Sequence, residues 1–386
     1  MSRVEVATGV LRWAIDRAGR TEGDLEKNKK FSKIREWLSG EIQPTLRQLE
    51  DLAKATCTPL GYLFLQNPPE ERLSIPHFRT LDDEEVRKPS PNLLETVQLM
   101  QHRQAWMREY LIDEGHDKLQ FVKSARISEP SSTVARKIRD ILDLEAGWAA
   151  KQPTWTIALS HLRNTIEDSG ILITFNGVVG NNTSRKLDPG EFRGFVLVDE
   201  YAPLVFVNGA DSKAAQMFTL AHELAHVIFG SSAAFDLREM QPANDPTEKA
   251  CNMVAAEFLV PEQELRALWH EPSNNREPFQ VIARQFKVSV LVAARRALDI
   301  DLIEKAEFIE FYRDYQNDER RKAAKRKPGG DFYETQNLRI GKRFASAIVQ
   351  ATREGKLLYS EAYKLTGLYG KTFESYSTSL EHGGEQ

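Results

Sequence analysis

The sequence predicts a mainly α-helical protein with one α+β domain in its central part. Most of the chain repeats apolar residues at helical spacing, as in Val134–Leu144 and Trp155–Gly170. Three short apolar runs have instead the pattern of strands, and they lie close together at 171–175, 192–199 and 203–208. Helical patterns return after the third run. Strands gathered between helical segments are typical of an α+β domain.

The composition is that of a globular protein without membrane spans. A length of 386 residues predicts two or three domains. Apolar residues make up 41% and charged residues 28% of the chain, and no apolar run approaches the roughly 18 residues that cross a bilayer. The polar start MSRVEVATGV lacks the apolar segment of a signal peptide. We therefore expect a cytoplasmic protein with no membrane partner.

Charge and cysteine content limit the chemistry that the chain can carry. The formal net charge is -4, so nucleic-acid binding would need a local basic cluster. The two cysteines, Cys57 and Cys251, lie far apart in the chain and provide neither a disulfide framework nor a cysteine-based zinc motif. Any metal must therefore be held by histidines and carboxylates.

Breaks in the helical pattern predict four parts. A set of short helical patterns fills 1–66, and a stretch rich in proline and charge leads into one long helical pattern within 67–130. The α+β domain occupies 131–318. A basic run, Arg320–Lys327, ends in Pro-Gly-Gly and opens the last part, 319–386, which is a basic linker followed by a small helical unit.

The stretch FTLAHELAHVIFG, Phe218–Gly230, carries the motif HExxH. Positions four apart share one face of a helix, so His222 and His226 can direct ring nitrogens at one metal ion. Glu223 is rotated by about 100° from His222, which puts it beside the metal, where it could act on a metal-activated water. The alternative is two core histidines on a buried helix. The predicted core-facing stripe consists of Leu220, Leu224, Val227 and Ile228.

A third ligand would favour the metal site, because catalytic zinc takes three protein ligands and one water. Glu248 is the best candidate, since small and apolar residues continue its helix face. The alternative is that Glu248 belongs to a capping box behind Asp245, with Pro246 as the first helical residue. Glu257 lies nine positions on, about 180° around the helix, and cannot share the face. Cys251 is interpreted as a small packing residue.

Both segments resemble a known family. FTLAHELAHVIFG and the downstream EKACNMVAAEFLVP are similar to the two helix motifs of the ImmA/IrrE family of zinc metallopeptidases. The resemblance implies a zincin-like domain of the gluzincin type, with His222, His226 and Glu248 as ligands and Glu223 as general base. It implies one Zn²⁺ per chain, with Mn²⁺ as another divalent candidate.

Two further features of such a peptidase stay open at the level of sequence. An oxyanion partner is needed, and Tyr201, Arg193 and His270 are all candidates. Such enzymes commonly hold the substrate as an added β-strand. The strand at Pro203–Asn208 is the candidate edge for it, and an ordinary core strand is the alternative.

The N-terminal part resembles a second family. FSKIREWLSGEIQPTLRQLEDLAKATCTPLGYLF is similar to the helix-turn-helix of phage-repressor-like (XRE) regulators, although the preceding helix departs from that pattern. Residues 1–65 hold 11 Lys or Arg against 9 Asp or Glu, a net charge of 11 − 9 = +2. The predicted contacts with operator DNA are Lys29, Lys30, Lys33 and Arg35. The alternative is a module that binds protein or forms a homodimer.

These resemblances imply two classes of function. The first is a zinc-dependent regulatory endopeptidase that cleaves a partner repressor or antitoxin, encoded nearby, and so relieves transcriptional repression. The second is a DNA-binding regulator or antitoxin of a toxin-antitoxin-type operon, in which the peptidase fold serves sensing or partner binding. The intact Glu223 favours the first class, because a scaffold has no need of a general base.

Overall fold

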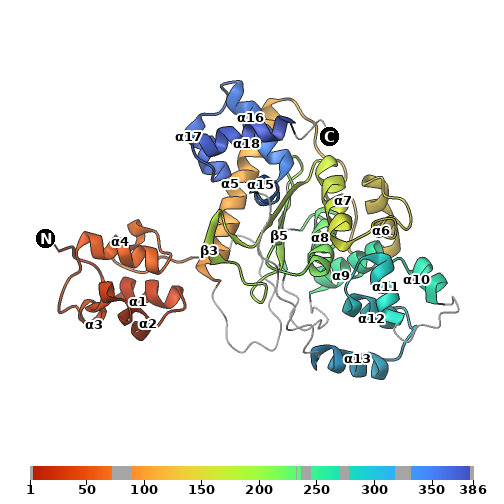
Figure 1. Ribbon diagram of the computed structural model, residues 1–386, viewed down its shortest axis with the longest axis horizontal. Coiled ribbons are helices and arrows are strands. Elements are labelled where there is room, and N and C mark those ends of the chain that lie inside the picture. The colour runs from red at the N-terminus through yellow and green to blue at the C-terminus, as the bar shows by residue number, and fades with distance from the viewer. Residues whose placement is uncertain are drawn as a thin grey trace. The chain divides into compact units, whose positions relative to one another are not determined.

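The computed structural model describes residues 3–71, 89–231, 233–235, 245–269, 278–317 and 332–382. The chain forms two compact units, one of residues 1–74 with 82–98 and one of residues 75–81 with 99–386. Most described residues are helical, and strands are few, which confirms the mainly α prediction (Figure 1). No helix among the described residues is long and apolar enough to span a membrane.

The first unit is a set of short helices around its own apolar core. Trp37 lies at its centre with a 1% exposed side chain, and Leu11 and Leu49 are fully buried beside it. Capping boxes at Thr21 and Thr45 fix the starts of two helices, because each threonine accepts from the third helical amide. The helices are α1 (Thr8–Arg17), α2 (Glu22–Glu26), η1 (Lys29–Phe31), α3 (Ile34–Ser39), α4 (Leu46–Ala55) and η2 (Leu60–Phe64).

The second unit is built on a mixed four-stranded sheet in the order β1-β5-β4-β6. The strands are β1 (Leu172–Asn176), β4 (Gly194–Leu197), β5 (Leu204–Asn208) and β6 (Ala233–Phe235). β1 runs parallel to β5, and the other neighbours are antiparallel. A separate hairpin joins β2 (Val178–Val179) to β3 (Asn182–Lys186). The three apolar runs are strands, as predicted, whereas β2, β3 and β6 were not predicted.

The sheet corrects the expected position of the substrate-binding edge. β5 pairs with β1 on one side and β4 on the other, so the prediction that this strand is an edge was wrong and the core-strand alternative holds. Within the described sheet the outer strands are β1 and β6. The C-terminal helices approach β1 closely, since a Cβ added at Gly341 would lie 2.5 Å from the carbonyl oxygen of Ile173.

Helices surround this sheet, and the apolar faces of several of them form one core with it. The predicted helices at Val134–Leu144 and Trp155–Gly170 are present, and helices return after the third predicted strand, as predicted. The helices of this part are α6 (Ser131–Ile141), α7 (Trp155–Asp168), α8 (Lys213–Phe229), α9 (Pro246–Leu259), α10 (Glu262–Trp269), α11 (Pro278–Phe286), α12 (Val290–Asp299) and α13 (Lys305–Asn317).

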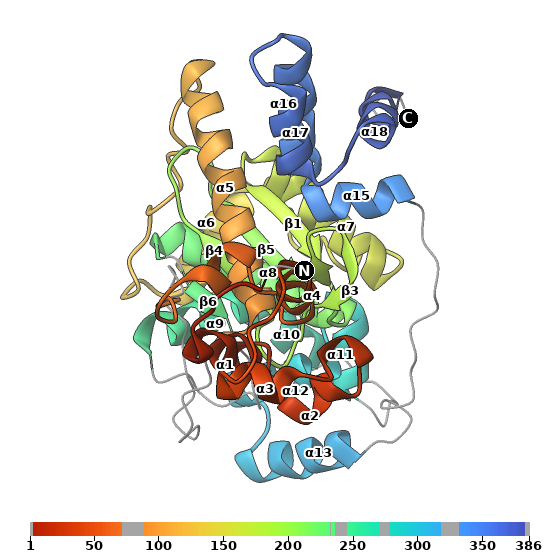
Figure 2. The ribbon, with the colours of Figure 1, turned by 90° about the vertical axis from the view of Figure 1, so that its left-hand side faces the viewer.

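The C-terminal helices gather around the long helix α5 (Pro91–Asp113) and the β1 side of the sheet (Figure 1, Figure 2). Arg103 of α5 is buried among them: its Nε donates to the carbonyl oxygen of Leu365 and its Nη1 to that of Arg339, both at 2.9 Å. The guanidinium thereby satisfies carbonyls at the ends of two helices. These helices are α15 (Phe332–Ile340), α16 (Lys342–Arg353), α17 (Tyr359–Thr366) and α18 (Lys371–His382).

Candidate metal centre

The helix that carries HExxH is fixed at both ends and buried along its length. The Ser212 side chain accepts a hydrogen bond from the amide of Ala215, and Gly230 ends α8 with a left-handed φ of 79°. Every residue from Gln216 to Ile228 is buried. The sequence predicted an apolar stripe on one side only. The histidine face is enclosed as well, because α9 packs against it.

His222, His226 and Glu248 converge on one point. The Nε2 atoms of the two histidines lie 3.1 Å apart, and each lies 3.1 Å from a carboxylate oxygen of Glu248. Ligands about 2.0–2.1 Å from a tetrahedral ion stand roughly 3.3 Å from one another, close to these separations. All three side chains are at most 4% exposed. The three ligand atoms therefore fit a divalent metal held by two imidazoles and one carboxylate.

Two neutral side chains hold the outer ring nitrogens of the histidines. Oδ1 of Asn252 lies 3.0 Å from Nδ1 of His222, and Oγ of Ser231 lies 2.9 Å from Nδ1 of His226. An amide oxygen can only accept, so Nδ1 of His222 carries the proton and its Nε2 keeps a lone pair for a metal. The sequence alone assigned neither Asn252 nor Ser231 this role. These contacts with the outer ring nitrogens can be recognised only in the folded structure.

The protonation states are those that metal ligation requires. Burial lowers the pKa of His222 to about 4, so the ring is neutral at pH 7. Burial alone would raise the pKa of Glu248, but the contacts with His222 and His226 outweigh it and lower that pKa to about 2. Metals bind neutral imidazole and ionised carboxylate. His222 and Glu248 are therefore each in the protonation state in which such a group binds a metal.

Glu223 lies at the same site with a fully buried carboxylate. Neither of its carboxylate oxygens has a hydrogen-bond partner among the described residues. Burial raises its pKa well above the ordinary value, and the charge of Glu248 adds to this. A buried, unpartnered carboxylate is costly in a finished fold. Its presence indicates that a polar species belongs beside it.

A glycine on the sheet makes room for this carboxylate. A Cβ added at Gly194, the first residue of β4, would lie 2.5 Å from Cγ2 of Thr219 and 3.1 Å from Oε1 of Glu223. β4 can therefore lie against α8 at this point only without a side chain.

Asp245 and Glu248 have different roles at the start of α9: Asp245 caps the helix, and Glu248 contacts the histidines. The Asp245 carboxylate accepts from the amides of Thr247 and Glu248, at 2.7 and 3.1 Å. The Glu248 carboxylate is directed to the histidines instead, so the cap and the ligand are different residues. Cys251 lies one turn further in the core, and burial raises the pKa of its thiol well above the usual range. It is a packing residue in its neutral form.

Two of the candidate oxyanion partners, Arg193 and Tyr201, lie among the described residues, and each has contacts with charged side chains. Nη1 of Arg193 lies 3.4 Å from a carboxylate oxygen of Asp211. The Tyr201 ring is contacted by the cations of Arg108 and Lys118, 5.6 and 5.9 Å from its centroid. His270 lies outside the described residues, as does the basic run Arg320–Lys327.

The cations predicted to contact DNA lie in the first unit. Three of them have carboxylate partners there: Lys30 with Asp51 at 2.8 Å, Lys33 with Glu36 at 3.8 Å and Arg35 with Glu26 at 2.7 Å. Lys29 is exposed on η1. These surface pairs reduce the local positive charge, and a phosphate backbone would have to compete with the carboxylates.

Comparison with known families adds to this geometry. Residues 166–298 match Peptidase_M78, the IrrE N-terminal-like domain. This segment contains β1, β4 and β5 of the sheet, both histidines, Glu223 and Glu248. The match indicates a metallopeptidase domain of the ImmA/IrrE type in this part of the chain. Residues 340–379 match a domain of unknown function, DUF8813. A comparison with curated proteins finds no match.

Proposed function

We propose that the chain is a zinc-dependent endopeptidase of the zincin-like, gluzincin type that cleaves a partner repressor or antitoxin and so relieves transcriptional repression. The observation that carries the proposal is the convergence of His222, His226 and Glu248, with the carboxylate of Glu223 beside them. A family match to a peptidase domain over the same residues supports it.

In this proposal the three ligands hold one Zn²⁺, and Glu223 handles protons. When bound, the ion supplies Lewis acidity to the scissile carbonyl and makes water a stronger acid near neutral pH. The Glu223 carboxylate takes the proton of the attacking water and delivers it to the nitrogen of the leaving amine. Asn252 and Ser231 keep the imidazole rings in the required orientation.

The substrate would enter as an extended segment. Peptide backbone can extend a sheet by adding a strand to its edge. On the β1 side the C-terminal helices lie against the strand, as the approach of Gly341 to Ile173 indicates, so we assign the substrate to the β6 side. β6 pairs with β4 from Gly194 to Val196, and Gly194 adjoins Glu223. A strand added to β6 would lie about 10 Å, two strand spacings, from Gly194.

The experiment compares the full-length wild type with Glu223→Gln. Metal content is measured by mass spectrometry, and each protein is incubated with the repressor or antitoxin encoded next to its gene. We expect one zinc ion per chain in both proteins and cleavage only by the wild type. Glu248→Gln serves as the matched variant that loses the metal and the cleavage together. Equal cleavage by the wild type and Glu223→Gln would sink the proposal.

The second class of function, a DNA-binding regulator, is favoured by one observation. The first unit has its own buried core around Trp37, as a separate binding module requires. Footprinting on the chain's own promoter tests it, with His222→Ala as the metal-site variant. If the DNA protection persists in this variant, and if the wild type leaves the neighbouring repressor or antitoxin uncleaved, the regulator is favoured over the peptidase.

A further inference from the structure

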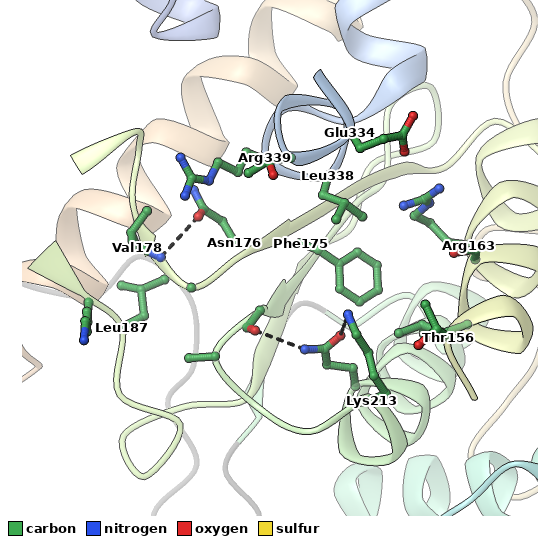
Figure 3. Close-up of a pocket in the computed structure, with 18 residues that line it drawn as sticks. Thr156, Arg163, Phe175, Asn176, Val178, Leu187, Lys213, Glu334, Leu338 and Arg339 are labelled. Carbon is green, nitrogen blue, oxygen red and sulfur yellow. Dashed lines mark hydrogen bonds between the residues drawn. The ribbon is translucent and has the colours of Figure 1, made fainter. Parts of the chain in front are cut away.

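A cavity lies away from the metal ligands, at the N-terminal end of α8. Its volume is about 590 Å³, which is within the range of small-molecule sites. It is formed by α7, the hairpin β2–β3, the ends of β1 and β5, the first turn of α8, and α15 (Figure 3). Both parallel strands end at this cavity, where ligands of open sheets commonly bind.

The walls are strongly basic. Arg163 of α7, Lys186 of β3, Lys213 of α8 and Arg339 of α15 line the cavity, and Glu334 is the acidic side chain among the lining residues. The formal charge of the lining is therefore +4 − 1 = +3, in a chain whose net charge is -4. A single solvent-exposed helix face would not explain these four cations, because they come from four separate elements.

The two arginines keep their charge exposed to a ligand. Nη2 of Arg163 lies 3.0 Å from the amide oxygen of Asn164, and Nη1 of Arg339 lies 3.4 Å from that of Asn181. Both of these hydrogen-bond partners are neutral, and Arg163 also interacts electrostatically with Glu167, one turn further along α7. Both arginines are half-buried at the cavity, where charge interactions are stronger than in open water.

The floor of the cavity is apolar and tightly built. Phe175 lies at the centre of the close-up, with Leu338 above it and Lys213 below (Figure 3). The loops after β1 and β5 touch through glycines: a Cβ added at Gly177 would lie 2.9 Å from the amide nitrogen of Ala210. An aromatic ring and aliphatic side chains beneath a basic rim suit a ligand with an anionic head and an apolar body.

We propose that this cavity binds a small organic phosphate, with the phosphate held by Arg163 and Lys213 and the apolar body on Phe175. A net charge of +3 favours a multiply charged phosphate over a single carboxylate, and guanidinium groups match its oxygens. This inference goes beyond the proposed function, because it requires neither metal nor proteolysis.

The cavity is connected to the metal centre by α8 itself. Lys213 is the first residue of this helix, and His222 follows nine residues later, about 13 Å along the helix axis. On the other wall, Glu334 and Arg339 belong to α15, which lies beside β1. A ligand in the cavity would therefore contact both the metal-bearing helix and the C-terminal helices.

Binding is tested by isothermal titration of the full-length protein with three probes: AMP, inorganic phosphate and adenosine. We expect AMP to bind more tightly than either of the other two, because it combines the charge with a planar body, and its affinity should fall as salt rises. Hydrogen exchange with AMP should slow at the first turn of α8 and in α15. Equal binding of AMP and adenosine would overturn the proposal, as would no binding of AMP.

Two variants that change the charge of the cavity in opposite directions make the test specific. Arg163→Gln should weaken AMP binding by about tenfold, the worth of one charge-assisted hydrogen bond, whereas Glu334→Gln should tighten it, because an acidic neighbour is removed. Arg136→Gln, on the exposed surface of α6, is the charge-matched control and should change nothing. The proposal fails if Arg163→Gln and Arg136→Gln behave alike.

Discussion

The side-chain amide oxygen of Asn252 lies 3.0 Å from Nδ1 of His222, one helical turn beyond Glu248 on α9. One helix thus supplies both a candidate ligand and the group that orients another ligand. Asn252→Ala should weaken zinc binding by roughly 10- to 100-fold while the chain stays folded. Competition with a chromogenic chelator measures the affinity. Met253→Ala, at a side chain that is 59% exposed on the same helix, is the control. Unchanged affinity in Asn252→Ala would remove the orienting role.

Removal of the metal should destabilise the second unit. Without a cation, the ionised carboxylate of Glu248 is buried with no compensating charge, and the raised pKa of Glu223 reflects the cost of a second charge beside it. A bound metal stabilises the native state by mass action, so EDTA should lower the melting temperature by roughly 5–10 °C. Calorimetry with and without added zinc measures this. His226→Ala should melt at the same temperature in both conditions, and an equal EDTA effect in this variant would contradict the assignment.

Gly194 should tolerate no larger residue. The added methyl group of Gly194→Ala would meet Cγ2 of Thr219 at 2.5 Å and the carbonyl oxygen of Phe206 at 2.8 Å. Overpacking of this kind costs about 1–3 kcal/mol, and we expect that loss in urea unfolding together with reduced peptidase activity. Gly61→Ala, with no atom within 4 Å of the new methyl group, is the control. Thr219→Ser removes the nearest atom and should recover part of the loss.

Arg103 should matter far more to stability than a surface arginine of the same helix. Its guanidinium donates to two helix-terminal carbonyls and lies over the Phe344 ring. Burial lowers its pKa to about 10, which leaves it charged at neutral pH. Arg103→Met leaves both carbonyls without this donor and should cost about 2–4 kcal/mol. Arg108→Met, from a half-exposed pair with Asp199, should cost at most about 1 kcal/mol. Equal losses would refute the capping role.

Glu167 should make stability depend on pH. Burial raises its pKa from 4.5 to about 7, although the charge of Arg163 and the amides of Arg343 and Lys342 at the start of α16 oppose this. The folded chain therefore binds the proton more tightly than the unfolded chain. The contribution of Glu167 to stability is greatest below pH 4.5 and is lost as the pH rises through 7, a change of up to about 3 kcal/mol.

Urea unfolding at pH 5 and pH 8 measures this loss in the wild type and in Glu167→Gln. The difference between the two pH values should shrink in the variant, because glutamine does not titrate. Glu145→Gln is the control, since an exposed pair with Lys151 lowers the pKa of Glu145 and keeps its titration below pH 5. A pH difference that is the same in all three proteins would show that Glu167 does not cause it.

Local signals in the sequence predicted the helices of the metal centre. The spacing of His222 and His226 and the cap at Asp245 are properties of one or two helical turns, so the residues alone were enough to place α8 and α9. The position of β5 could not be predicted in this way, because strand order depends on pairing between distant segments. The apolar run of β5 is equally compatible with a central strand and with an edge strand that is buried on one face.

Other features were hidden because their partners are distant or their pattern is weak. β3 is a polar, largely exposed strand without alternation, so nothing distinguished it from a loop. Ser231 is a single small residue after a glycine, and only the turn at the end of α8 brings its hydroxyl to His226. The cavity beside Arg163 and Arg339 joins residues from separate elements far apart in the chain. Such convergence is a property of the tertiary fold.

The contacts of Arg103 also have a meaning for the timing of synthesis. Its two acceptors lie 236 and 262 positions further along the chain. A nascent chain that already holds the histidines and Glu248 still lacks the last helices that close over this arginine. The guanidinium group of Arg103 therefore stays hydrated until Leu365 has left the ribosome. The second unit is therefore completed late in translation, after every residue of the metal centre has been made.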